Sequence, residues 1–460
     1  MEELSLFNFS QMKINKPIRL IEFFGGIGSQ AMALRDIGAD FEHYKLVEVD
    51  KYAVQSYNAI HDTQFTPLDI REVHAGNLEV KDKDKFCYIV TYSFPCTDLS
   101  VAGKMKGMSK ADWENGNSTR SGLLWEVERI LKECTKDELP QILLMENVPQ
   151  VHAERNMADF ESWLSFLRSK GYHNHWQDFN AKNYGIPQSR NRCFCVSILS
   201  DEFVDFEFPD PIPLTTVMKD YLEEEVDEKY YINTDKANKL IKQFITNNVI
   251  DGLKDRITID LTIKDPQEIS VANCIVSHIY KNGIYKRGKE GNGVIKITKA
   301  RILGKMKGKY ESSNRVYDKE ALCPTLNTCQ GSGQKPKIIN KCIVAMRGRN
   351  PEKPTSRKAG LPTDQKLEKA PEGIEKSNVV PTLTASSSEN INYVEIQYRL
   401  RELTPKECWR LMGYTDKDFE KAQKAGVSNS QLYKQAGNAI VKQVLMSIFQ
   451  NMNIQILKGV

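Results

Sequence analysis

The sequence predicts an α/β protein in which a strand-rich, basic segment interrupts a domain built on a parallel sheet. Apolar stretches alternate with amphipathic segments over residues 18–200, as they do in βαβ units. Residues 281–349 lack helical periodicity and are rich in Gly, Ser, Asn and Pro, which is typical of short strands joined by loops. A length of 460 residues leaves room for one large domain with an insertion, or for about three domains.

The composition is that of a soluble globular protein. Hydrophobic residues make up 40% of the chain and charged residues 27%. No apolar run approaches the roughly 18 residues of a membrane span, and the amino terminus lacks the pattern of a signal peptide. We therefore expect a cytoplasmic protein without a membrane partner, and a monomer.

The ten cysteines are interpreted as reduced thiols, and no metal site is expected. The close pairs are Cys193 with Cys195 and Cys323 with Cys329, and neither has the Cys-x2-Cys partner of a structural zinc site. His173 and His175 are interpreted as neighbours on one strand face rather than as ligands.

Positive charge is concentrated in one region. Residues 281–349 contain seventeen Lys and Arg and four acidic residues, a net charge of +13, whereas the whole chain carries +4. This asymmetry suggests a surface for a polyanion, although a solvated Lys-rich surface would look the same.

The first elements form a candidate cofactor site. A strand is expected over 18–24, a helix over 29–37 and a second strand over 45–49. Phe24, Gly25, Gly26, Ile27 and Gly28 make a tight turn between the first strand and the helix, and Glu48 ends the second strand, where an acid can hold ribose hydroxyls. Alone, this pattern also fits a dinucleotide enzyme or a structural turn.

Reactive side chains follow later strands. A strand over 88–94 leads into Pro95-Cys96, and a strand over 141–145 leads into Glu146, so both side chains are expected at the same sheet edge. Gln188, Arg190 and Arg192 alternate and face one way, although either arginine could be a surface charge.

Taken in order, these motifs resemble those of the DNA cytosine-5 methyltransferases. The matching segments are Phe24-x-Gly26-x-Gly28, Pro95-Cys96, Arg120 to Glu126, Glu146-Asn147-Val148, Gln188-x-Arg190-x-Arg192, Arg401 to Tyr414 and Gln435 to Ala439. The resemblance implies a Rossmann-like, S-adenosylmethionine-dependent methyltransferase domain with an inserted, mainly β target recognition domain. It places the catalytic domain at 1–205, the DNA-reading insertion at 206–396 and the C-terminal return at 397–460.

The resemblance also implies the chemistry. Cys96 would attack C6 of a flipped-out cytosine in double-stranded DNA, Glu146 would hold and protonate N3, and Arg192 would support O2, with Arg190 beside them. Glu146 should then have a raised pKa. Methylation at C5 would follow, and loss of the C5 proton would expel Cys96.

The same resemblance assigns the S-adenosylmethionine site. Its expected residues are Phe24, Gly26, Ile27, Gly28, Glu48, Asp69, Ile70, Phe94, Leu123 and Asn438. Several of the apolar ones could be ordinary core, Asp69 could cap the next helix, and Asn438 could be a turn residue. Glu22, Ser29, Val49 and Thr97 depart from the usual family pattern, which puts the detailed cofactor contacts in doubt rather than the reaction.

Two alternatives stay open. An RNA cytosine-5 methyltransferase shares a similar motif set, although an insertion of nearly 190 residues favours DNA. A DNA-binding protein with an inactive methyltransferase fold is the other. The resemblance also implies a bacterial or phage source and leaves room for a cognate restriction endonuclease.

Overall fold

The computed structural model describes much of the chain, with side chains at 13–99, 106–117, 119–231, 316, 317, 319, 321–326, 335–339 and 401–456. Only the backbone is described within the strands at 258–260, 267–268, 292–294, 302–305, 315, 340–347 and 392–400. The chain divides into two units: Met1–Thr216 with Cys323–Lys335 and Thr404–Val460, and Val217–Leu322 with Pro336–Leu403.

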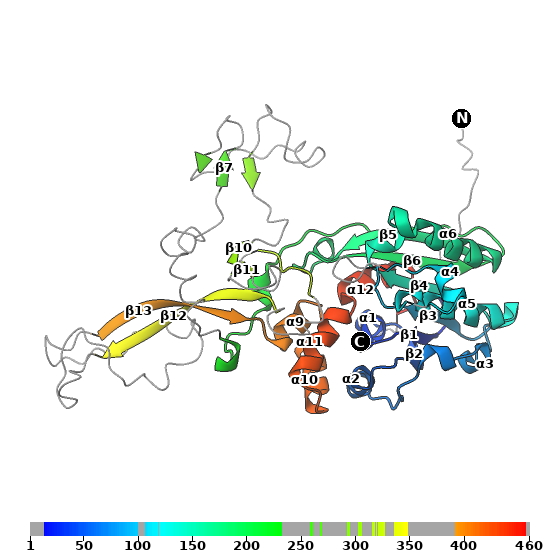
Figure 1. Cartoon of the computed structure of the whole chain (residues 1–460), viewed down its shortest axis with the longest axis horizontal. Helices are drawn as coiled ribbons and strands as arrows, with labels where there is room; N and C mark the ends of the chain where they lie inside the picture. The colour runs from blue at the N-terminus through cyan, green and yellow to red at the C-terminus, as the bar shows by residue number, and fades with distance from the viewer. Residues whose placement is uncertain are drawn as a thin grey trace. The chain divides into compact units, whose positions relative to one another are not determined.

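A six-stranded sheet forms the centre of the first unit. The order is β2-β1-β3-β4-β6-β5, made of β1 Ile18–Phe23, β2 Phe41–Val47, β3 Cys87–Tyr92, β4 Ile142–Asn147, β5 Tyr172–Asn180 and β6 Asn191–Leu199 (Figure 1). β1 to β4 pair in parallel, as the sequence predicts. The sheet is mixed, because β6 runs antiparallel to both of its neighbours. Only ten residues, 181–190, join β5 to β6, and a parallel connection needs a longer crossover.

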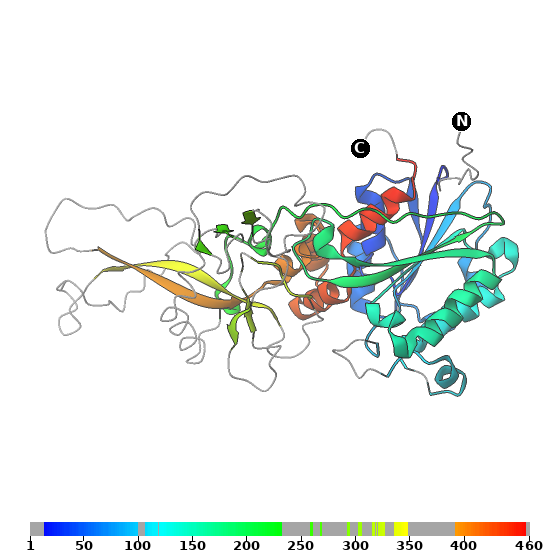
Figure 2. The same ribbon diagram turned by 90° about the horizontal axis from the view of Figure 1, so that it is seen from above.

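Helices cover both faces of this sheet. Those before the second unit are α1 Ser29–Asp36, α2 Lys51–His61, α3 Ala75–Leu78, α4 Lys110–Glu114, α5 Leu124–Glu133 and α6 Glu154–Ser169. Those after it are α9 Pro405–Arg410, α10 Asp416–Lys424, α11 Asn429–Asn438 and α12 Lys442–Asn451. Figure 2 shows α1 and α12 together on one face and the long helix α6 on the other.

Polar contacts fix the C-terminal helices to the start of the chain. The guanidinium of Arg35 donates two hydrogen bonds, of 2.8 and 3.0 Å, to the carboxylate of Asp418. The hydroxyls of Ser29 and Tyr414 lie 2.7 Å apart in the interior. Residues 404–456 therefore pack as part of the same unit as the sheet, although hundreds of residues separate them from it in sequence.

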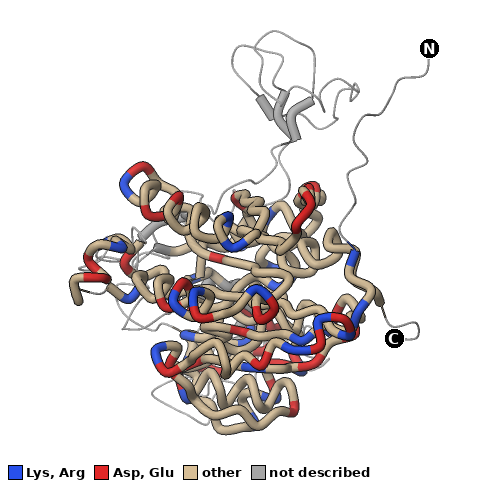
Figure 3. The backbone as a smooth tube through the Cα atoms, turned by 90° about the vertical axis from the view of Figure 1, so that its right-hand side faces the viewer, with Lys and Arg blue, Asp and Glu red and all other residues tan. Residues whose placement is uncertain are grey.

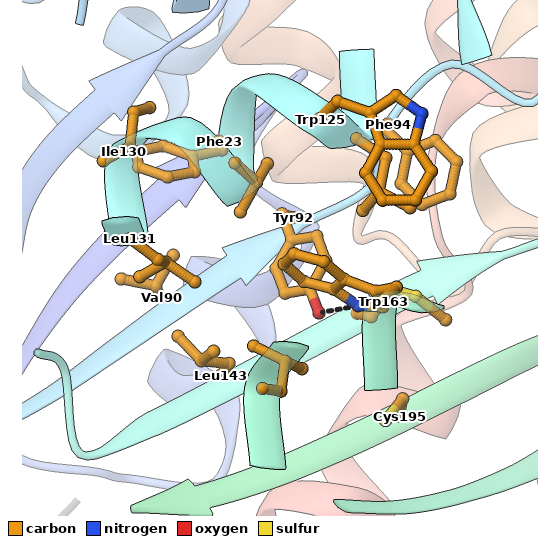
Figure 4. Close-up of a cluster of buried hydrophobic side chains, with 14 of the residues drawn as sticks. Phe23, Val90, Tyr92, Phe94, Trp125, Ile130, Leu131, Leu143, Trp163 and Cys195 are labelled. Atoms are coloured by element: carbon orange, nitrogen blue, oxygen red, sulfur yellow. Dashed lines mark hydrogen bonds between the residues drawn. The ribbon is translucent and has the colours of Figure 1, made fainter. Parts of the chain in front are cut away.

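The main core lies between the sheet and helices α5 and α6. Every residue of β3 is buried, as is typical of a parallel strand covered on both faces. Figure 4 shows Tyr92 of β3 against Trp163 of α6, with the indole Nε1 donating a 3.2 Å hydrogen bond to the tyrosine hydroxyl. This bond satisfies two polar atoms that would be costly to bury alone.

The described elements of the second unit are strands and two short 3-10 turns, in line with the predicted strand-rich insertion. One sheet has the order β10-β11-β12-β13 and another β8-β7-β9. The bounds are η6 Met218–Tyr221, η7 Glu228–Tyr230, β7 Thr258–Asp260, β8 Gln267–Glu268, β9 Asn292–Val294, β10 Ile302–Lys305, β11 Arg315–Tyr317, β12 Lys337–Arg347 and β13 Asn392–Glu402. Most side chains of the basic segment 281–349 lie outside the described residues. Figure 3 shows that basic and acidic residues are interspersed along the described part of the whole chain.

The second unit differs in extent from the predicted insertion of 206–396. Residues 323–335 belong to the first unit. The backbone explains this, because the N–H of Cys323 donates to the carbonyl of Pro187 at 2.7 Å and its carbonyl accepts from Ser189 at 3.0 Å. The DNA-reading role of the insertion stays a prediction. Among the described helices, none combines the length and apolar character that a membrane span requires.

Candidate active site

One cavity of about 400 Å³ opens where the parallel strands end. Its wall includes residues that directly follow β1, β2 and β3, and the last two residues of β4. Thirteen of the predicted site residues line it: Phe24, Gly26, Ile27, Glu48, Asp69, Ile70, Phe94, Cys96, Leu123, Glu146, Arg190, Arg192 and Asn438. Predicted residues that lie far apart in sequence thus share one hollow at the carboxyl edge of the sheet.

Gly28, the remaining residue of the predicted site, does not line this cavity. It has a φ of 82° and precedes α1 as its N-cap. A Cβ on Gly28 would lie 2.3 Å from Nε2 of His61 and 2.7 Å from Cε2 of Tyr57. The absence of a side chain therefore serves the packing of α1 against α2 rather than a direct ligand contact. At Gly26, with a φ of 58°, a Cβ would meet nothing within 4 Å.

Glu48 anchors the glycine-rich turn from the neighbouring strand. Its Oε2 accepts from the N–H of Gly26 at 3.0 Å and its Oε1 from the N–H of Asp50 at 2.8 Å. Burial raises the pKa of Glu48, and these two backbone hydrogen bonds oppose the rise. Asp50 in turn accepts from Nζ of Lys434 on α11 at 2.7 Å, so the C-terminal return reaches the same wall.

Asp69 caps a short helix and also lines the cavity. Its carboxylate accepts from the N–H of Arg71 at 3.0 Å and caps the 3-10 helix η1 Ile70–Glu72, while the residue also lines the cavity. The Arg71 side chain holds the pKa of Asp69 below its usual value. Ile70 and Phe94 are almost fully buried, so they belong both to the core and to the cavity wall.

Hydrogen bonds shape the loop that carries Cys96. The amide of Asn147 donates to the carbonyl of Phe94 at 2.9 Å. The hydroxyl of Ser121 donates to the carbonyl of Pro95 at 2.6 Å and accepts from the N–H of Asp98 at 3.2 Å. The backbone on both sides of Cys96 is thus held by two buried side chains, one from β4 and one from the 3-10 helix η2 Ser121–Leu123.

Glu146 and Arg192 form a buried ion pair in the cavity wall. The Arg192 Nε lies 3.1 Å from Oε1 of Glu146, and the two side chains are only 15% and 10% exposed. Burial raises the pKa of Glu146, in the direction that the sequence analysis expects, while Arg192 and Arg190 oppose the rise. Burial also raises the pKa of the Cys96 thiol, and the charge of Arg192 opposes this. One arginine therefore favours the charged forms of both groups.

Arg190 binds backbone rather than the carboxylate. Its guanidinium donates to the carbonyls of Leu326, Gly437 and Ala439 at 3.0, 3.0 and 2.7 Å. Gln188, which is fully buried, similarly donates to the carbonyl of Leu411 at 2.7 Å. These contacts join the segment before β6 to 323–335 and to the C-terminal helices, which indicates a positioning role for Arg190.

Sequence patterns did not point to the roles of Ser121 and Asn147, or to the pairing of Asp50 with Lys434. Asn147 and Ser121 lie inside the quoted motifs, but buried hydrogen bonds to a neighbouring loop leave no signal in a single sequence. Asp50 and Lys434 are 384 residues apart, so their pairing needed the tertiary structure.

The comparisons with known proteins decide the family. Residues 18–453 match the family model of the C-5 cytosine-specific DNA methylases. The chain belongs to this family. The resemblance seen in the motifs is confirmed, and the chain is a DNA cytosine methyltransferase.

Similar methyltransferases come from phages and bacteria. Orphan methyltransferase M.SPBetaI of Bacillus phage SPbeta is 28% identical, over 95% of this chain and 97% of the relative. Orphan methyltransferase M.SPRI of Bacillus phage SPR is 30% identical over the same shares. Type II methyltransferase M2.ScrFI of Lactococcus lactis subsp. cremoris is 26% identical, over 95% and 99%.

Solved structures support the fold of the methyltransferase. The Entamoeba histolytica methyltransferase EhMeth aligns with a TM-score of 0.53 at 15% identity, over 95% of this chain and 98% of that chain. S. pombe Dnmt2 aligns with a TM-score of 0.51 at 16% identity, over 95% and 98%. The predicted Rossmann-like α/β class is confirmed, with the mixed sheet described above.

Proposed function

We propose that this methyltransferase transfers a methyl group from S-adenosylmethionine to C5 of a flipped-out cytosine in a specific duplex DNA sequence, through a covalent bond between Cys96 and C6. The observation that carries the proposal is the shared cavity. Cys96, Glu146 and Arg192 line it together with the glycine-rich turn and Glu48, so nucleophile, acid and cofactor residues share one enclosure.

The residues of the cavity fit S-adenosylmethionine. A volume of about 400 Å³ lies within the roughly 300–1,000 Å³ of typical small-molecule sites. Gly26 presents backbone without a side chain, and the Glu48 carboxylate, already oriented by two N–H groups, has lone pairs left for ribose hydroxyls. Phe24, Asp69, Ile70, Phe94, Leu123 and Asn438 would complete the cofactor site. The cofactor supplies an electrophilic methyl group on a sulfonium.

Cys96 and Glu146 make cytosine reactive toward such a group. The Cys96 thiolate adds to C6, which breaks the C5–C6 double bond and places electron density on C5. Glu146, whose pKa is raised by burial, donates a proton to N3, and Arg192 stabilises the O2 side of the ring. After methylation, solvent water takes the C5 proton and N3 returns its proton to Glu146, so that the C5–C6 double bond re-forms and the Cys96 thiolate leaves.

The target base must leave the helix to reach this cavity, because C6 is covered by stacking in duplex DNA. Extrusion costs about a few kcal/mol, which contacts to the phosphates would offset. We assign sequence reading and part of this phosphate contact to the inserted segment, predicted at 206–396. Two of the relatives are named orphan methyltransferases, so a cognate endonuclease is not part of the proposal.

Two experiments test the proposal. Expression in a host without DNA methylation, followed by bisulfite sequencing, should show methylated cytosine at one recurring sequence. The purified chain should transfer label from S-adenosylmethionine to duplex DNA and not to tRNA. Transfer to tRNA alone would contradict the DNA assignment.

The covalent step has its own test. Cys96→Ala should lower turnover by at least about three orders of magnitude, as expected for loss of a nucleophile, and still bind DNA. DNA with 5-fluorocytosine should trap the wild type as a stable adduct, because fluorine at C5 cannot leave as a proton does. Cys134→Ala removes a buried thiol that does not line the cavity and should leave both results unchanged. Turnover by Cys96→Ala would rule out the nucleophile.

A further inference from the structure

Three side chains of metal-ligand type converge beside β6, outside the cavity wall. They are His152, at the end of the 3-10 helix η4 Pro149–His152, Asp178 of β5 and Cys193 of β6. One potential ligand atom from each lies within 4.8 Å of the other two. Within the part of the chain that the structure describes, no other group of three His, Cys, Asp or Glu side chains meets this spacing.

The strand register produces part of this arrangement. Asp178 and Cys193 are direct partners in the antiparallel pair of β5 and β6, so their side chains point to the same face of the sheet. Cys193 is in turn the partner of Asn147 on β4. The chain leaves β4 after Asn147 and turns through η4, which brings Nε2 of His152 to 2.9 Å from Oδ1 of Asp178.

The three side chains combine a buried ligand with an open approach. Cys193 is fully buried, whereas the side chains of His152 and Asp178 are 21% and 33% exposed. An ion could therefore enter from the His152 and Asp178 side. The rings of Trp176 and Phe160 flank His152, with centroids 4.8 and 6.4 Å away. This apolar rim limits the positions that the imidazole can take.

We propose that His152, Asp178 and Cys193 bind a divalent transition metal ion, with zinc the best match to the donors. Thiolate, imidazole and carboxylate are its usual protein ligands, and three of them leave a fourth position for water. In a tetrahedral zinc site such ligand atoms lie roughly 3.3–3.6 Å apart, from bond lengths of about 2.0–2.3 Å. Movement of about an ångström would convert the present spacing into that geometry.

This site is separate from the methylation cavity but close to it along the chain. Cys193 follows Arg192 directly, and its strand partner Asn147 follows Glu146. A bound ion would tie β5, β6 and η4 together next to the ends that carry the ion pair. Its expected effect is therefore to raise the melting temperature of the chain, and the proposed methyl transfer does not require it.

The sequence predicts no metal site because it contains no Cys-x2-Cys pair of the kind that structural zinc sites use. His152, Asp178 and Cys193 are spaced by 26 and 15 residues and come from three elements. Their approach depends on the position of β6 between β4 and β5, which the sequence did not predict.

Cobalt(II) titration of the purified full-length chain tests the proposal. We expect one Co²⁺ per chain, with the near-ultraviolet charge-transfer absorption of a thiolate ligand, and loss of that absorption when Zn²⁺ displaces it. Cys193→Ser should abolish the absorption. Asp178→Asn and His152→Gln alter partly exposed side chains and should fold. Each substitution should weaken Co²⁺ binding at least about tenfold. Loss of a residue that merely hydrogen-bonds to a metal ligand already lowers metal affinity by about 10–100-fold.

Three matched variants make the assignment specific. Cys195→Ser removes a buried thiol two residues away on the same strand, and Cys96→Ser removes the thiol of the methylation cavity. His175→Gln removes a β5 imidazole whose Nε2 lies 3.0 Å from the carbonyl of Val204. All three should bind Co²⁺ like the wild type. The proposal is overturned if the wild type shows no thiolate absorption, if Cys193→Ser keeps it, or if a matched variant loses it. These experiments measure Co²⁺ binding and not methylation, so their results do not test the proposed function.

Discussion

The hydroxyl of Tyr57 donates a 2.5 Å hydrogen bond to Oε2 of Glu22, in the interior beneath the glycine-rich turn. Glu22 is fully buried, and its Oε1 has no hydrogen-bond partner among the described residues. Burial raises the pKa of Glu22 to about 8, against the partial stabilisation of the charged form by Tyr57. The side chain is therefore protonated near neutral pH, unlike a carboxyl group in the unfolded chain.

Stability should consequently fall as pH rises from about 5 to about 8. In this window the folded state holds a proton on Glu22 that the unfolded state has lost, so its contribution is complete at low pH and disappears toward pH 8. The slope is at most about 1.4 kcal/mol per pH unit. Urea unfolding at pH 6 and pH 8 should show this loss in the wild type and a smaller one in Glu22→Gln.

Glu79→Gln is the control for this measurement. Glu79 is exposed, and its hydrogen bond with Lys45 lowers its pKa, so it does not titrate between pH 6 and pH 8. An identical pH slope in the wild type and Glu22→Gln would show that Glu22 is not the responsible group.

Alanine substitutions at Gly26 and Gly28 should have different consequences. Both positions have a positive φ, which costs a non-glycine residue about 1–2 kcal/mol. Gly28→Ala also forces a Cβ against His61 and Tyr57, so it should lower the free energy of unfolding by clearly more than Gly26→Ala. Gly26→Ala should instead raise the KM for S-adenosylmethionine, because Gly26 lines the cavity. Denaturant unfolding and steady-state kinetics measure the two effects, and equal destabilisation would contradict the packing role of Gly28.

Ser121→Ala should slow turnover without touching the reacting groups. The substitution leaves the carbonyl of Pro95 and the N–H of Asp98 without a buried partner, at a cost of about 1–3 kcal/mol in stability. Because Cys96 lies between these two residues, kcat should fall while the KM for S-adenosylmethionine changes little. The exposed Ser165→Ala serves as control, and a change in KM alone would argue against positioning of the thiol.

Substituting glutamine at Glu146 and at Glu48 separates chemistry from cofactor binding. Glu146→Gln removes the proposed proton donor and should lower kcat about 10²–10⁴-fold. Glu48→Gln should raise mainly the KM for S-adenosylmethionine, since this carboxylate contacts the glycine-rich turn. Measuring kcat and the KM for S-adenosylmethionine of both variants on duplex DNA checks this prediction. It is wrong if both variants change the same constant by the same factor.

Neutralising the basic segment should weaken the salt dependence of DNA binding. Replacing Lys286 and Arg287 with alanine should reduce the slope of log affinity against log salt by about 1 per lost phosphate contact. The exposed Lys132→Ala on α5 should leave the slope unchanged. If substitutions throughout 281–349 left the slope unchanged, the basic residues of this segment would not contact DNA phosphates.

The sequence alone determined which candidate side chains reach the carboxyl edge of the sheet. Strand patterns placed Glu48, Cys96 and Glu146 after separate buried strands, and strands β1 to β4 bring them to one cavity because parallel strands end at a common edge. The α1 helix begins at Ser29 as expected, directly after the glycine-rich turn.

Only the tertiary structure decided which long-range partners these groups meet. Arg190 binds carbonyls of Leu326, Gly437 and Ala439, and its place on an alternating pattern could not distinguish this from a catalytic role. The place of β6 between β4 and β5 was likewise settled only by pairing between distant strands, and this pairing brings His152, Asp178 and Cys193 together. Local patterns report burial and turns, whereas pairing between distant segments depends on how the whole chain packs.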